Sequence, residues 1–209
     1  MSPRDIAHTA RKRGLEMVAL TDHNSALNTP AFAAACKKEG ITGIYGMEVT
    51  TQEEAHILCL FESPDIAMEF GEFLYPLIPD ISNDPDKMGD QVYVDADENI
   101  LGEVEKWLVG AAALGLDSLL SEVHQRGGLY IPAHIDKPVY SIPSQLGFLP
   151  PMDYDALESV QLPSPLPGLP QDIPVIQNSD AHYIEDIGKR FTDYDLISAD
   201  FSGLYHRFH

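Results

Sequence analysis

The chain has 209 residues, 44% of them hydrophobic, and a formal net charge of -20 at pH 7. That length suits one folded domain, and no apolar run approaches the roughly 20 residues that a membrane-spanning helix needs. The start, Met1 to Asp5, lacks the cationic and apolar regions of a secretory signal, so we expect a cytoplasmic protein with no membrane partner. The negative charge opposes binding to a phosphate backbone and therefore disfavours a nucleic-acid polymer as partner.

The first part of the chain alternates predicted helices and strands. Serine followed by proline is typical of a helix start, glycine marks the stops, and the strands are short runs of branched and aromatic residues. In chain order we expect a helix at Ser2–Arg13, a strand at Leu15–Leu20, a helix at Pro30–Glu39, strands at Ile41–Tyr45 and His56–Phe61, and a helix from Ser63 to about Leu77.

The composition changes at Pro79–Asn99, where Asp, Asn, Pro and Gly predict a loop insertion with a short hairpin near its end. This insertion is either a lid over a substrate or an ordinary surface excursion. The remaining elements are a helical pattern at Glu103–Arg126, broken near Gly115, and strands at Leu129–Ala133, Leu157–Leu162 and Ile173–Gln177. The alternation predicts one mostly parallel α/β domain over residues 1–209.

Possible metal ligands lie at the edges of five predicted strands. Any one histidine there is more ordinarily a hydrogen-bonded structural residue, but in an α/β barrel such strand ends meet on one face. Imidazole and carboxylate together suit Zn, Mn or Fe, and a carboxylate can bridge two ions. The candidate ligands are His23, Glu48, His56, His134, Asp180 and His182.

Five short motifs carry a resemblance to a known family. In this order they resemble the signature of the PHP family, named for polymerase and histidinol phosphatase, over about Met1 to Phe208. The resemblance implies a distorted seven-stranded (βα)7 TIM-like barrel that holds two or three divalent transition metal ions (Zn, Mn or Fe) and hydrolyses phosphate esters. The motifs are Thr21-Asp22-His23-Asn24, Gly46-Met47-Glu48, His56-Ile57-Leu58, Pro132-Ala133-His134 and Ser179-Asp180-Ala181-His182.

The resemblance also implies roles for single residues. Glu48 would bridge two metal ions, and His56 and His134 would complete one of those two sites. His23 and His182 would bind a third ion.

The remaining candidates have supporting or substrate roles. By resemblance Asp180 would bind the ion on the other side of Glu48, and Asp22 would support the cluster, for instance by orienting an imidazole. Lys137 and Arg190 each follow a ligand motif closely, so they are our candidates for contacts with a phosphate group, with ordinary surface pairing as the alternative.

The sequence departs from the family pattern at its start. Members normally begin with a strand that ends in His-x-His, before the segment that matches Ser2–Arg13, and no such segment is seen. His8 lies within the first predicted helix and is most simply a surface residue. We therefore expect either a misassigned start or a barrel without its first strand, which would cost one metal site two ligands.

The leading functional hypothesis is an enzyme: a phosphoesterase in which metal-activated water, and no protein nucleophile, attacks the phosphate ester of a small metabolite or nucleotide. One alternative is a catalytically degraded PHP module with a structural or interaction role. Another is an amidohydrolase-like enzyme that cleaves bonds other than phosphate esters. A serine hydrolase and a nucleotide-binding fold are disfavoured because neither a Gly-x-Ser-x-Gly elbow nor a glycine-rich phosphate loop occurs.

Overall fold

The computed structural model describes all 209 residues. Its helices are α1 (Pro3–Lys12), α2 (Thr29–Glu39), α3 (Pro64–Leu74), α4 (Pro85–Met88), α5 (Leu116–Gln125), α6 (Ile142–Leu146) and α7 (Phe201–Phe208), with short 3-10 turns η1 (Tyr75–Leu77) and η2 (Ile184–Asp186). Its strands are β1 (Met17–His23), β2 (Thr42–Thr50), β3 (His56–Phe61), β4 (Val92–Val94), β5 (Ile100–Glu103), β6 (Leu129–Pro132), β7 (Leu157–Glu158) and β8 (Val175–Ile176).

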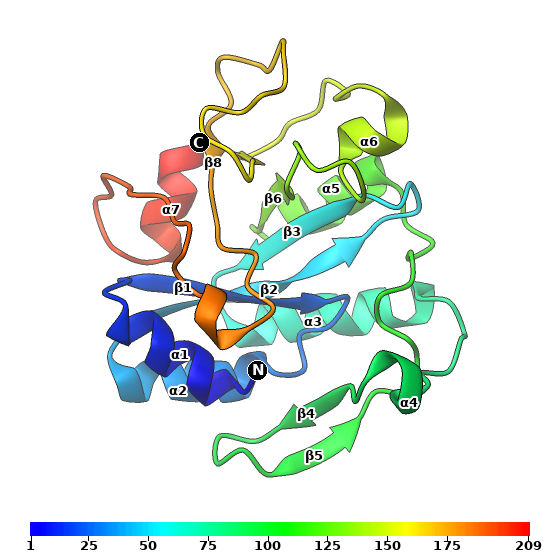
Figure 1. Ribbon diagram of the computed structural model, residues 1–209, viewed down its shortest axis with the longest axis vertical. Helices are drawn as coiled ribbons and strands as arrows, with labels where there is room; N and C mark the ends of the chain where they lie inside the picture. Colours follow the sequence, from blue (N-terminus) through cyan, green and yellow to red (C-terminus); the bar gives the residue numbers. More distant parts are fainter.

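The centre of the molecule is a four-stranded sheet in the order β1-β2-β3-β6 (Figure 1). β1 and β2 pair in parallel, whereas β3 is antiparallel to both β2 and β6. Three strands therefore run in one direction and β3 runs in the other. As a result, the first residue of β3 lies at the same edge of the sheet as the last residues of its neighbours.

The expected seven-stranded (βα)7 barrel is not found, because the sheets are mixed and no closed barrel forms. β7 and β8 are only two residues long each and pair with one another in a separate two-stranded sheet. Between them lies the segment with Pro163, Pro165, Pro167 and Pro170, whose nitrogens cannot donate to a strand ladder. The α/β class is confirmed, and the part of the chain that would close a barrel is mainly loop.

The two faces of the central sheet have different covers. On one face Met47, Cys59 and Phe61 pack with buried side chains of α3 and α5, while α1 and α2 pack beside β1 (Figure 1). On the other face, apolar side chains of β2, β3 and β6 pack with Phe201 and Leu204 of α7. This second face is apolar at one end only, and its other end carries the polar residues described below.

Local signals for helix boundaries are confirmed at several points. The Ser2 and Ser63 hydroxyls accept backbone N–H groups at the starts of α1 and α3, each with a proline in the first turn. Gly40 ends α2 in the left-handed conformation, at φ 67°. Cys36 and Cys59 are free and buried. None of the helices has the length and apolar character needed to cross a membrane.

The helix expected at Glu103–Arg126 begins only at Leu116. The preceding residues are instead held as an extended connection against the end of β2, since Ala112 N–H donates to Thr50 and Gln52 N–H donates to Leu114, at 2.9 and 3.0 Å. Long-range backbone pairing thus overrides the local helical pattern. The expected hairpin in the insertion is present as the antiparallel pair β4–β5.

A buried carboxylate ties α5, β6 and the C-terminal helix together. Asp155 is 4% exposed and accepts the Tyr130 backbone N–H at 2.5 Å. His124 of α5 lies 3.0 Å from one carboxylate oxygen of Asp155, and His209 lies 3.2 Å from the other. The hydrogen bond to Asp155 raises the pKa of His124 above its usual value.

The raised pKa of His124 predicts a pH-dependent stability. Its contribution is fully present below the unfolded-state pKa of about 6.5 and is lost as the pH rises through the folded-state value. His124→Gln should lower the free energy of unfolding by about 1–2 kcal/mol near pH 5.5 and by less near pH 8.5, measured by urea denaturation. A difference between variant and wild type that grows with pH would contradict this assignment.

Candidate metal centre

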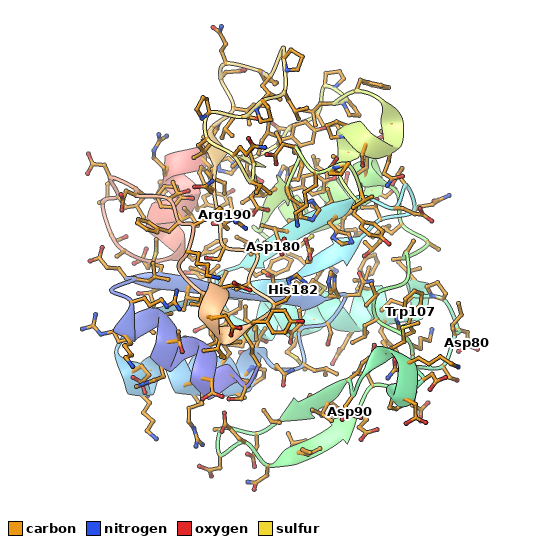
Figure 2. The ribbon with its side chains drawn as sticks, viewed as in Figure 1. Asp80, Asp90, Trp107, Asp180, His182 and Arg190 are labelled. Atoms are coloured by element: carbon orange, nitrogen blue, oxygen red, sulfur yellow. The ribbon has the colours of Figure 1, made fainter.

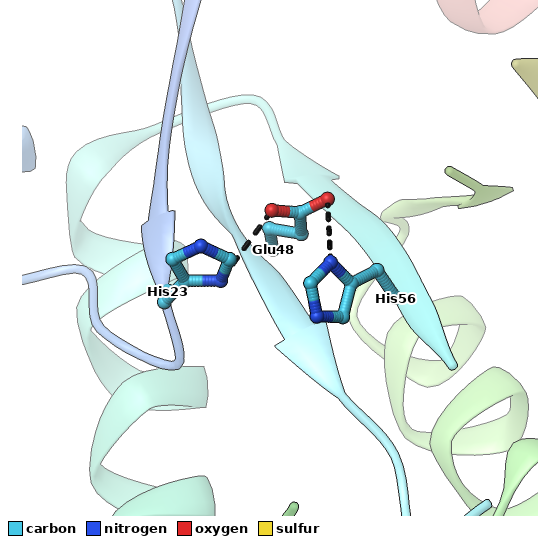
Figure 3. Close-up of side chains that lie close together, drawn as sticks. All are labelled: His23, Glu48 and His56. Atoms are coloured by element: carbon cyan, nitrogen blue, oxygen red, sulfur yellow. Dashed lines mark ion pairs between the residues drawn. The ribbon is translucent and has the colours of Figure 1, made fainter. Parts of the chain in front are cut away.

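The strand register brings potential ligands to one edge of the sheet. His23, the last residue of β1, lies opposite Glu48 in the parallel pairing, so the two side chains share a face. Glu48 lies opposite Leu58 of β3, and His56 is two residues from Leu58 and therefore on that face too (Figure 3). β6 ends at Pro132, and the turn that follows delivers His134 to the same place.

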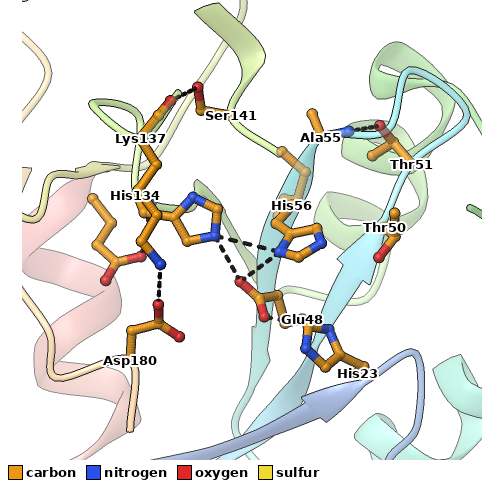
Figure 4. Close-up of polar contacts among 12 residues, drawn as sticks. His23, Glu48, Thr50, Thr51, Ala55, His56, His134, Lys137, Ser141 and Asp180 are labelled. Carbon is orange, nitrogen blue, oxygen red and sulfur yellow. Dashed lines mark hydrogen bonds and ion pairs between the residues drawn. The ribbon is translucent and has the colours of Figure 1, made fainter. Parts of the chain in front are cut away.

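The Glu48 carboxylate is the centre of this cluster. Its Oε1 lies 3.3 Å from His56 Nδ1 and 3.3 Å from His134 Nε2 (Figure 4). Its Oε2 lies 3.4 Å from His23 Nδ1. The two carboxylate oxygens thus face different imidazoles, which is the arrangement that a bridging carboxylate requires.

The electrostatics favour the protonation states that bind metal ions. Burial acting alone would raise the pKa of Glu48, but hydrogen bonds from His134 and His56 and the charges of His56 and His23 outweigh it, and the pKa lies well below its usual value. Burial lowers the pKa of His23, against the opposing charge of Glu48. An ionised carboxylate and a neutral imidazole are the forms that coordinate a metal.

Unpartnered nitrogen atoms show that the donor set fits a metal ion. His56 Nε2 and His134 Nδ1 are buried and make no hydrogen bond, and the only polar contact of the buried His23 Nδ1 is its 3.4 Å approach to Glu48. Leaving such an atom unpaired is costly, and a coordinated cation would satisfy its lone pair. Ligand atoms of His23, Glu48 and His56 also lie within 4.8 Å of one another. Nitrogen and oxygen donors in this mixture suit Zn, Mn or Fe.

Asp180 and His182 lie at the margin of the cluster, on the loop after β8 (Figure 2). The His182 ring is 6.1 Å from that of His23, and its side chain is 61% exposed. Asp180 pairs with Lys137, whose Nζ is 2.5 Å from Oδ2 (Figure 4). The structure therefore brings His23, Glu48, His56 and His134 into direct contact and leaves Asp180 and His182 beside them.

Asp22 hydrogen-bonds to a side chain on its own side of β1, and Arg190 hydrogen-bonds to backbone carbonyls. Asp22 alternates with His23 along β1 and accepts a hydrogen bond from Asn28 Nδ2 at 3.1 Å. Burial raises the pKa of Asp22 above its usual value. Arg190 donates to the carbonyls of Asn178 and Ser179, at 3.2 and 2.9 Å, and so braces the loop that carries Asp180.

Glu158 is a residue of this region that the sequence analysis missed. It is 3% exposed, its Oε2 accepts the backbone N–H of His134 at 3.0 Å, and its carbonyl accepts that of Ile135 at 2.8 Å. Burial raises the pKa of Glu158 to about 7. The signal available in the sequence is an acidic residue within the predicted strand Leu157–Leu162.

Left-handed backbone conformations recur around the cluster and also occur elsewhere, at Glu54 and Glu98. Asn24, His134 and Asp180 have positive φ values of 47°, 31° and 47°, which residues with a side chain rarely adopt. Such conformations persist only where surrounding contacts enforce them, and they cluster at functional sites. Asn24 is held by donating to the carbonyls of Leu108 and Gly110 and accepting the Thr50 N–H.

A separate cavity of about 470 Å³ lies beyond the end of β1, between the Asn24–Leu27 loop, α3 and the β4–β5 hairpin. None of the clustered histidines lines it, and neither does Glu48. The polar cluster, rather than this cavity, is therefore the candidate centre.

The sequence of the chain matches the model of a known protein family. The family model of the PHP domain matches residues 1–158. The chain belongs to the PHP family. The matched region of this PHP domain holds His23, Glu48, His56 and His134, and it ends before the loop with Asp180 and His182.

One protein of known sequence and several solved structures are similar to this chain. Over 64 residues the chain is 38% identical to an uncharacterized protein of Methanocaldococcus jannaschii, covering 31% of this chain and 37% of that protein. A candidate metal-dependent phosphoesterase of Bifidobacterium adolescentis has a similar fold, with a TM-score of 0.61 at 18% identity, over 93% of this chain and 88% of that one.

Endonuclease Q shares the fold as well. The lesion-specific endonuclease Q of Pyrococcus furiosus matches 98% of this chain and 50% of its own, with a TM-score of 0.60 at 18% identity. Endonuclease Q solved with a 27-mer duplex that carries an abasic lesion at its active site matches with a TM-score of 0.62 at 19% identity, over 100% of this chain and 51% of that one. This chain spans about half the length of those endonuclease chains.

The expectation that net charge disfavours a nucleic-acid polymer is wrong. A protein with a similar fold, endonuclease Q, has been solved in complex with a 27-mer duplex substrate. The formal charge of -20 is a sum over the whole surface. Contact with a phosphate is local, and bound cations can reverse the local sign of the charge.

Glu158 should affect metal affinity through the turn that holds His134. Glu158→Leu removes the acceptor of the His134 N–H and should weaken binding of Zn²⁺ or Mn²⁺ about 10- to 100-fold in a chelator competition. Glu158→Gln keeps an oxygen acceptor and should stay within about threefold of wild type. Equal weakening in both variants would instead point to the carboxylate charge, and no weakening in either would remove Glu158 from the site.

Proposed function

We propose that this PHP domain is a metal-dependent phosphoesterase that hydrolyses the phosphate ester of a small metabolite or nucleotide, with water as the nucleophile. The observation that carries the proposal is the buried Glu48 carboxylate, whose oxygens lie 3.3–3.4 Å from nitrogens of three imidazoles. Family membership supports a metal-dependent hydrolase, and the unpartnered buried nitrogens support metal ligation.

The proposed ligands form two groups. His56 and His134 belong with Glu48 Oε1, and His23 belongs with Oε2, since these are the contacts of each oxygen. Asp180 and His182 would complete the set from the neighbouring loop. Two or three divalent ions of Zn, Mn or Fe, when bound, would stabilise negative charge on a phosphoryl group and acidify water.

The side chains around the ligands bind and orient. Lys137 is the proposed phosphate contact because its ammonium group lies at the cluster while its side chain stays 36% exposed. The ion pair with Asp180 holds the ammonium group of Lys137 in this position. If Asp180 bound a metal ion instead, the ammonium group would be free to contact a phosphate oxygen. Arg190 is the second proposed contact, since two carbonyls occupy only some of its donors.

A phosphodiester within nucleic acid is the second candidate substrate. The shared fold with endonuclease Q favours it, although the activity of that longer protein is a property of that protein. The two candidates differ in the substrate that is cleaved, and the cluster itself would serve either one.

Metal content and hydrolysis test the function together. The purified chain should hold two or more transition metal ions, measured by mass spectrometry, and should hydrolyse p-nitrophenyl phosphate or a duplex with an abasic site. His134→Ala removes a contact of Glu48 and should lower hydrolysis at least about 100-fold. His8→Ala, in an exposed side chain of α1 that pairs with Glu39, should have no effect.

The two hydrolysis assays and the metal content distinguish the candidate functions. Hydrolysis of the small ester alone supports the first candidate, and cleavage of the duplex alone supports the second. A folded chain that binds no metal and cleaves neither substrate would rule out both, and it would favour a PHP module with a structural or interaction role.

A further inference from the structure

Tyr140 contacts the cluster in two ways. Its ring lies parallel to the His56 imidazole, with centroids 4.8 Å apart and an interplanar angle of 11°. Its backbone carbonyl accepts the His56 N–H at 2.8 Å. The imidazole of His56, a proposed metal ligand, therefore covers one face of the Tyr140 ring. The loop that carries Tyr140 also hydrogen-bonds to the first residue of β3.

Much of Tyr140 is accessible. The residue is 44% exposed although His56 stacks on one face of its ring, so the accessible part lies away from His56. Its hydroxyl group makes no hydrogen bond within the chain, and the preceding Val139 is 54% exposed. A flat apolar surface thus stands beside a polar, metal-competent cluster.

The loop holds this ring in a fixed position. Tyr140 has φ 56°, a conformation that is a genuine outlier for a bulky residue. The flanking residues fasten the loop, because the Ser141 hydroxyl donates to the Lys137 carbonyl at 2.8 Å and also caps α6 (Figure 4). Lys137 in turn pairs with Asp180. A strained but tethered aromatic side chain is preorganised, so little ordering is needed when a ligand stacks on it.

These features match a ligand with an aromatic ring at one end and a phosphate group at the other. Aromatic rings stack in offset parallel geometry, and any nucleobase offers a π face for such a contact. The cluster beside the ring is the proposed place for the phosphate. The rival explanation is that Tyr140 only shields His56 from water, a role that an aliphatic side chain could also fill.

Given the phosphoesterase function proposed above, we propose that the ring of Tyr140, on its side away from His56, binds a planar aromatic ring of the substrate, such as a nucleobase. Tyr140 is then a specificity-determining residue, and the substrate class is a nucleotide or another phosphate ester with an aromatic ring. Aliphatic phosphate esters would bind at the cluster alone.

The test compares two substrates and three variants of the full, metal-loaded chain. Tyr140→Leu keeps an apolar cover over His56 but removes the aromatic face, and it should raise the KM for adenosine monophosphate on the order of 10-fold. Its kcat/KM for glycerol phosphate should change less than about twofold. Tyr140→Phe should behave as wild type toward both substrates. Phe148→Leu is the matched control, because Phe148 is an aromatic residue that is 60% exposed and lies outside the cluster.

An equal loss of activity toward both substrates in Tyr140→Leu, with lower metal content, would overturn the proposal in favour of simple shielding. Calorimetric binding of adenosine monophosphate separates this inference from the proposed function. If the wild-type chain cleaves neither ester, the function fails, and weaker binding to Tyr140→Leu than to Phe148→Leu would still support the stacking site. Equal binding to the two variants, or no binding to the wild type, would overturn it.

Discussion

An ionised carboxylate can remain in a nearly dry place only if positive or polar groups surround it, and Glu48 meets this condition through three imidazoles. Glu48 is 6% exposed, and its neighbours come from β1, from β3 and from the turn after β6. The reversal of β3 is what makes the arrangement possible, because it brings the first residue of that strand to the edge where the others end. Moving any of these strands by one residue would turn its ligand to the opposite face.

Much of the centre could be predicted from sequence, because strand ends are local features. His56 begins its strand as predicted, and His134 lies in the predicted motif after β6. His23 ends a strand that was predicted to stop at Leu20. The barrel could not be predicted in the same way. Its closure depends on long-range pairing, and β7 and β8 contribute only two residues each. The helix expected before Leu116 failed for a similar reason, since backbone groups of residues 112–114 pair with the end of β2 and its turn.

Glu158 and Tyr140 were missed because their roles arise from contacts made across the fold. Glu158 is 24 residues from the N–H group that it accepts. Tyr140 reaches His56 only through a turn in an unusual backbone conformation. The expectation about nucleic acid was wrong for a different reason, because it relied on the net charge of the whole chain. A total charge of -20 describes the whole surface, but the Glu48 cluster combines one carboxylate with three imidazoles, so it is far less negative than that total suggests.

Asn24 connects the segment after the β4–β5 hairpin to the Glu48 cluster. Its side chain joins the end of β1 to the carbonyls of Leu108 and Gly110 and to the N–H of Thr50 at the end of β2. Asn24 is covalently bonded to His23. Residues 108–110 follow the β4–β5 hairpin, so a displacement of that segment must either break these hydrogen bonds or pull His23 relative to Glu48. The position of the segment after the hairpin and the distance between His23 and Glu48 are therefore coupled through the side chain of Asn24.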